Sequence, residues 1–125
     1  MIFNFAIMKL EFILNVQARF LEKGTNKPLS GKEYICKLFD YDILKNDFLG
    51  EAHPDNTGLV HFSVDPKSFR DFNNLIDKYP DLFIEVEYEE ELLFATPIAK
   101  NAKVLEGGTF DIKEGEVIDL GTFLV

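Results

Sequence analysis

The chain has few of the histidine and cysteine residues on which most zinc and thiol sites depend. Its 125 residues include two histidines and one cysteine, and it also lacks tryptophan. A single cysteine cannot form an intrachain disulfide bond. Cys36 alternates with Tyr34 and Leu38 in "YICKLF", which predicts a buried, unreactive thiol. His53 and His61 have neither a paired cysteine nor a third imidazole, so we expect a surface histidine and a strand histidine rather than a zinc site.

Basic residues are also scarce. The sequence has 13 lysines and arginines against 22 aspartates and glutamates, which gives a formal net charge of −9 at pH 7. An acidic protein gains nothing from the phosphates of a nucleic acid, so we expect no nucleic-acid binding. Unaided docking to an anionic membrane is disfavoured for the same electrostatic reason. Cations and basic partners are the natural counterparts of this charge.

The sequence contains no apolar run of membrane-spanning length. The opening "MIFNFAIM" is apolar but too short to cross a bilayer, and it has neither a basic leader nor a small-residue cleavage site after it. The regular pattern begins directly after Met8, so Met1 and Met8 are both candidate starts. We expect residues 1–8 to be a short N-terminal extension, residues 9–125 to form one domain, and the protein to be cytoplasmic.

What the sequence has in abundance is phenylalanine and period-two alternation. It carries 13 phenylalanines in a chain that is 46% hydrophobic, which favours a thick apolar core. In "KLEFILNVQARF" every second residue is apolar, the pattern of a half-buried strand. "EYICKLF" is apolar on both faces, which indicates a central strand, and Pro97 indicates an edge or an end. The predicted strands are 9–20, 33–39, 48–53, 59–64, 82–88, 92–98, 105–112 and 115–125.

One segment departs from this period. After Asp65, a candidate N-cap, Pro66 opens a stretch in which Phe69, Phe72 and Ile76 share one helical stripe. The fold class that we predict is therefore all-β, a two-sheet antiparallel β-sandwich of seven or eight strands with one short helix inserted between late strands. The predicted inter-sheet core comprises Phe12, Leu14, Val16, Leu38, Val60, Phe62, Ile84 and Val86.

Three segments together resemble a known family. "TNKPLSGKEYICKLFDYD", "DNTGLVHFSVDPKSF" and "YPDLFIEVEYEE" are similar to successive pieces of a transthyretin-like (prealbumin-like) sandwich. In that family a strand ending in a Val-x-Asp corner feeds a short helix, and "VDPKSF" has this form. The enzymatic branch adds histidine and arginine ligands and a Tyr-Arg-Gly-Ser tail, whereas this chain ends in "GTFLV". The resemblance therefore implies the non-enzymatic branch.

The acidic stretch 40–51, "DYDILKNDFLGE", is the main candidate site. It resembles the third loop of the calcium-dependent phospholipid-docking domains of synaptotagmin and protein kinase C. Asp40, Asp42 and Asp47 are the candidate metal ligands, since calcium takes six to eight oxygens at about 2.3–2.6 Å. Those domains complete the site with aspartates from a first loop across the sandwich end. The corresponding segment here, "LEKGTNKPLSGK", has lysines instead, so we predict a partly exposed, solvated acidic rim.

These observations favour a non-catalytic binding or assembly module with no cofactor. Its expected partner is another protein, or a second copy of the chain, rather than a small molecule. A calcium-dependent docking domain that uses residues 40–51 is the alternative. An unrecognised hydrolase is the second alternative, although no motif places a base beside Ser63 or Ser68.

Overall fold

The computed structural model describes residues 14–65, 81–99 and 117–125. The predicted N-terminal extension, the predicted helix after Asp65 and the predicted strand at 105–112 lie outside the described residues, as does Phe12 of the predicted core.

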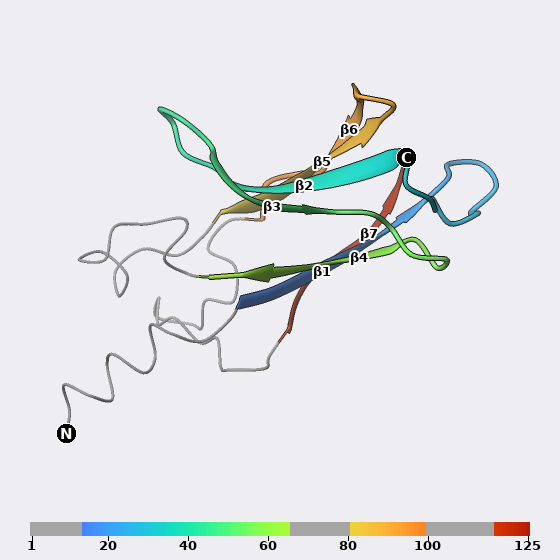
Figure 1. Cartoon of the computed structure of the whole chain (residues 1–125), viewed down its shortest axis with the longest axis horizontal. Coiled ribbons are helices and arrows are strands. Elements are labelled where there is room, and N and C mark those ends of the chain that lie inside the picture. Colours follow the sequence, from blue (N-terminus) through green and yellow to red (C-terminus); the bar gives the residue numbers. More distant parts are fainter. Residues whose placement is uncertain (1–13, 66–80, 100–116) are drawn as a thin grey trace.

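The described residues form seven strands, of which β1 and β4 show the period-two alternation most clearly. The strands, shown in Figure 1, are β1 (Leu14–Leu21), β2 (Tyr34–Asp40), β3 (Asp47–Ala52), β4 (Leu59–Val64), β5 (Leu82–Tyr88), β6 (Glu91–Ala95) and β7 (Val117–Leu124). They make a three-stranded sheet with the order β4-β1-β7 and a four-stranded sheet with the order β3-β2-β5-β6. The prediction of an all-β, two-sheet architecture is confirmed in these residues.

The prediction of a wholly antiparallel arrangement is wrong at one pair. β7 runs parallel to β1, with Val16 opposite Ile118 and Phe20 opposite Phe123, and the register shifts between Gln17 and Arg19. All the other paired strands are antiparallel. The period-two pattern is the same whichever way a strand runs, so it could not reveal this direction. A parallel neighbour needs a long crossover, which the intervening strands of both sheets supply.

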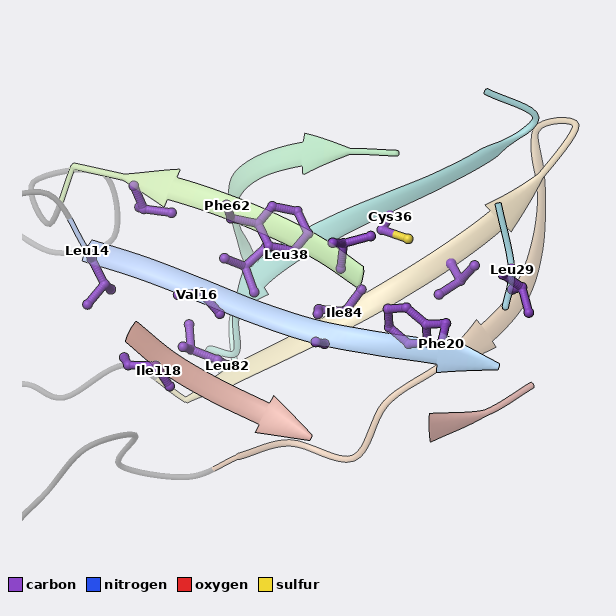
Figure 2. Packing of buried hydrophobic residues seen from close by; sticks show 14 residues of the cluster. Leu14, Val16, Phe20, Leu29, Cys36, Leu38, Phe62, Leu82, Ile84 and Ile118 are labelled. Carbon is purple, nitrogen blue, oxygen red and sulfur yellow. The ribbon is translucent and has the colours of Figure 1, made fainter. Parts of the chain in front are cut away.

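The core lies between the two sheets, where the inward residues of β1, β2, β4 and β5 meet (Figure 2). Seven of the eight predicted core residues lie in the described part, and all seven are buried. They are Leu14, Val16, Leu38, Val60, Phe62, Ile84 and Val86. The predicted register of these strands is therefore confirmed.

Two predictions about single strands are also confirmed. β2 lies inside its sheet, between β3 and β5, and β6 forms a border of the same sheet with Pro97 just beyond its end.

Cys36 is buried on the inward face of β2, and burial raises the pKa of its thiol to about 12. Since only the thiolate is an efficient nucleophile, this cysteine is a core residue and not a reactive one.

The sandwich has two ends, and each holds a different set of loops. The turn end carries the 22–33 loop, the turns at 55–58 and 89–90, and Val125, whose amide donates to the Leu21 carbonyl. The acidic end carries the 41–46 loop and Asp81, whose carbonyl accepts from the Tyr41 amide. In Figure 1 the 22–33 loop lies beside the C-terminus, far from the 41–46 loop.

This arrangement corrects the prediction that the lysine-rich loop lies across from the acidic stretch. Lys23, Lys27 and Lys32 precede the start of β2, and the acidic loop follows its end. A seven-residue strand spans roughly 20 Å at about 3.3 Å per residue. The lysines and the acidic loop are thus at opposite ends of the sandwich, and the lysines do not neutralise its carboxylates.

Candidate functional site

The loop between β2 and β3 is shaped by its own side chains. The Asp42 Oδ1 atom accepts a hydrogen bond from the Leu44 amide at 3.0 Å. The Asp42 amide donates to the Asn46 Oδ1 atom at 3.3 Å. An aspartate that accepts from the backbone two residues ahead forms an Asx-type turn, which replaces a backbone turn. Asp42 therefore helps to define the path of the loop.

Asp40 differs from the expectation of a partly exposed ligand, because it is only 1% exposed. It follows Cys36 and Leu38 in the inward register of β2, so its side chain points between the sheets. Its Oδ1 atom accepts from the Asp81 amide at 2.9 Å, and the Tyr41 amide donates to the Asp81 carbonyl at 2.7 Å. Asp40 thus ties the end of β2 to the start of β5. A solvated rim is the wrong description of this carboxylate.

Asp47 opens β3 and is paired with Asp40 in the sheet register. It is half-buried, as is Asp42. The structure therefore brings Asp40 and Asp47 to neighbouring positions at the acidic end and holds Asp42 in the loop beyond them. Within residues 14–65, 81–99 and 117–125, no group of three or more histidine, cysteine, aspartate or glutamate side chains is arranged to hold a metal ion.

The same loop carries two apolar side chains that the sequence analysis overlooked. Ile43 is 86% exposed and Leu44 is 94% exposed, at the turn that Asp42 stabilises. We call these two residues the apolar tip. In the sequence, the adjacent Ile and Leu in "DYDILKND" indicate this exposed apolar pair. They are hidden when the segment is considered only for its acidic charges. Large apolar side chains held in water commonly mark contact surfaces.

An aromatic row lies behind the apolar tip, on the outer face of the four-stranded sheet. Phe48 of β3 and Phe83 of β5 are the register partners of Phe39 on β2. The Phe39 and Phe83 rings stack with centroids 5.2 Å apart, and the Phe39 and Phe48 rings meet edge to face at 5.8 Å. Phe48 remains 52% exposed. The row gives the strands at the base of the loop a firm support.

The other sequence candidates lie apart from this loop. His53 and His61 are both exposed, as expected, and the Nδ1 atom of His53 lies 2.8 Å from the Tyr34 carbonyl oxygen. Ser63 is exposed on β4, and its hydroxyl donates to the Asn15 Oδ1 atom at 3.5 Å. An amide oxygen is no general base, so this contact does not activate the serine. Ser68 lies outside the described residues.

Comparisons with known proteins bear on the fold alone. No family model and no curated protein matches the chain. Among solved structures, the chain is similar to a 9R-lipoxygenase from Cyanothece PCC8801, with a TM-score of 0.55 and 19% identity. The similarity covers 99% of this chain and 20% of that one, so the chain spans about a fifth of the length of the solved protein. In the described part of the chain no helix is long and apolar enough to cross a membrane.

Proposed function

We propose that the chain is a non-catalytic binding or assembly module on a transthyretin-like sandwich, and that the apolar tip is its contact surface for a protein partner. The observation that carries this proposal is the exposure of Ile43 and Leu44, at 86% and 94%. Fully burying a side chain of this kind contributes about 1.5–3 kcal/mol.

The apolar tip is suited to a protein surface because it projects and is pre-organised. The Asp42 carboxylate holds the turn, and the aromatic row supports the strands on either side. A loop that is already ordered loses less conformational entropy on binding than a flexible one. A small molecule would need a concave site that surrounds it, whereas a protein pocket can enclose a projecting pair of side chains.

Replacing both Ile43 and Leu44 by serine should reduce partner binding about tenfold or more, because two apolar contacts are lost. The free energy of unfolding should change by less than about 0.5 kcal/mol, since both side chains are on the surface. The affinity-tagged chain is cross-linked to its bound partner, and the amount of partner protein recovered is measured. Sedimentation measures self-association. Leu124→Ser is the control, because Leu124 is 49% exposed on β7. Equal recovery of the partner with the wild type, the double variant and Leu124→Ser would exclude the apolar tip as the contact surface.

Calcium-dependent docking is the second candidate. It is favoured by one observation, that Asp40 and Asp47 are register partners directly below the apolar tip. Against it, the Oδ1 atoms of Asp40 and Asp42 already accept backbone hydrogen bonds that hold the sheet and the loop. A cation that took these oxygens would compete with the amides of Asp81 and Leu44. We therefore rank this function below protein binding.

Millimolar calcium should leave the melting temperature nearly unchanged, and Asp42→Asn should be close to neutral, since an asparagine oxygen can also accept from the Leu44 amide. A ligand at a hundredfold excess over its Kd stabilises a fold by ~2.7 kcal/mol, which a thermal melt detects easily. The melt is run with calcium and then with chelator. A rise of several degrees that Asp42→Asn removes would promote the docking function.

A further inference from the structure

The hairpin between β5 and β6 has an unusual turn. Tyr88 pairs with Glu91, so the turn residues are Glu89 and Glu90. Both have positive φ, at 50° and 73°. Two-residue hairpins with positive φ at both positions strongly prefer Asn-Gly or Asp-Gly, because a Cβ atom is crowded in this conformation. Two glutamates in these positions are therefore unfavourable for the fold, and their side chains call for another reason to be there.

The strand that follows this turn presents an open apolar edge. β6 is at the border of the four-stranded sheet, and in the described ranges no strand pairs with its outer side (Figure 1). Leu92 is 61% exposed and Leu93 is 51% exposed. The register shifts opposite Val86 and Glu87, which leaves Leu93 as the extra residue of β6. An exposed apolar edge strand is a template on which another extended chain can pair.

Negative charge surrounds this edge. Glu89, Glu90 and Glu91 are consecutive and exposed, and the Glu89 amide donates to the carbonyl of Glu33, another exposed glutamate. The charge of Glu89 is the main reason that the pKa of Tyr88 lies above its ordinary value. The ion pair found in the described residues is between Lys37 and Glu87, at 3.0 Å, and does not involve the turn glutamates, which are exposed.

We infer that the outer edge of β6 binds an extended, lysine- or arginine-rich segment of a partner protein. The segment adds to the four-stranded sheet as a fifth strand, places apolar side chains against Leu92 and Leu93, and sets its cations beside Glu89–Glu91. Charge complementarity selects this occupant over a second copy. Each copy has a net charge of −9 and would bring its own Glu89–Glu91 to the edge, so like charges oppose self-pairing and favour a cationic segment.

This surface is independent of the apolar tip. Tyr88 pairs with Tyr34 at the start of β2, which places the hairpin turn at the turn end, whereas the apolar tip follows the end of β2. Figure 1 shows β6 and its turn standing apart from the 41–46 loop. A variant at one surface therefore leaves the other intact, and the two proposals fail separately.

The probe is a synthetic peptide of alternating lysine and valine, with the length of one strand. We expect it to bind the full chain and to slow hydrogen exchange of the β6 amides. Glu89→Asn combined with Glu90→Gly should weaken binding about tenfold, through the loss of two ion pairs. The same variant should raise the melting temperature by roughly 3–6 °C, because its turn residues tolerate positive φ. Weaker binding by a more stable protein cannot be ascribed to unfolding.

Three controls separate strand addition from general attraction between opposite charges. Glu51→Gln combined with Asp119→Asn removes two exposed carboxylates, one on β3 and one on β7, and should change the affinity less than twofold. Ile43→Ser combined with Leu44→Ser should not change it. A peptide N-methylated on alternate amides keeps its charge but cannot pair along one edge, and should bind about tenfold more weakly. Equal binding by the methylated peptide, equal binding by the Glu89/Glu90 variant, or dimerisation through β6 would each overturn the inference.

Discussion

Replacing Phe20 by alanine should lower the free energy of unfolding by about 4 kcal/mol. Phe20 is completely buried, and its ring joins strands of both sheets (Figure 2). It stacks on Phe123 of β7, with centroids 5.7 Å apart, and meets Phe94 of β6 edge to face at 6.4 Å. Truncating a buried phenylalanine to alanine costs about 3–5 kcal/mol, through lost apolar burial and the cavity that remains. The loss would be a large share of the stability of an ordinary domain, about 5–15 kcal/mol.

Urea unfolding of the wild type and the variant measures this difference. Phe48→Ala is the matched control, because it removes the same atoms from a ring that is 52% exposed. It should cost less than about 1 kcal/mol, since most of that ring is already in water. Similar losses for the two variants would mean that the space between the sheets at Phe20 is not close-packed.

The core and the strand segments that form it could be predicted because period-two alternation records which face of a strand is buried. β1 shows this most clearly, with Leu14, Val16, Ala18 and Phe20 all buried. The central place of β2 could be predicted for a related reason. Its outward residue Phe39 is apolar as well, and it stacks on Phe83 of the next strand.

The burial of Asp40 was present in the same pattern but was given less weight than its charge. Cys36, Leu38 and Asp40 occupy every second position of β2, and all three side chains are buried. The charge of Asp40 suggested solvent or calcium, and the Asp81 amide that it accepts from lies 41 positions away in the sequence. A hydrogen bond between strands so distant in sequence cannot be read from local spacing, so the tertiary partner decided the position of this carboxylate.

Other features depend on geometry that residue patterns do not encode. Alternation does not record the direction of β7. It also does not record the end of the sandwich at which each loop lies, which is why the lysines of the 22–33 loop were expected beside the acidic stretch. Glu89 and Glu90 form the β5–β6 turn. Their positive φ values run against the preference of glutamate, so propensity could not predict them.

The turn before β4 is built around one aspartate and one glycine. The Asp55 Oδ1 atom accepts from the Thr57 hydroxyl at 2.7 Å, the Thr57 amide at 2.8 Å and the Leu59 amide at 3.1 Å. The hydrogen bond from the Thr57 side chain is the main reason that the pKa of Asp55 lies below its usual value. The chain then reverses through Gly58, whose amide donates to the Asp55 carbonyl at 3.0 Å. This network fixes Gly58 against the end of β1.

Gly58→Ala should destabilise the fold by about 3 kcal/mol. Gly58 has a φ of +81°, where an alanine costs about 1–2 kcal/mol. Its Cβ atom would also fall well inside van der Waals contact with the backbone carbonyl oxygen of Phe20. The Phe20 amide donates to the Gly58 carbonyl at 2.9 Å, so the two segments cannot separate without losing this hydrogen bond. Forcing extra volume into such a packed contact adds about 1–3 kcal/mol.

Gly24→Ala isolates the steric part of this effect. Gly24 has a similar φ of +95°, but a Cβ atom there would meet nothing within 4 Å. The Gly24 variant should therefore cost only the backbone term, about 1 kcal/mol, and should melt well above the Gly58 variant. Urea unfolding of the two variants beside the wild type gives the difference directly. If both alanines cost the same, the close approach of Gly58 to the Phe20 carbonyl is not part of the folded protein, and the β1–β4 register at the turn end is wrong.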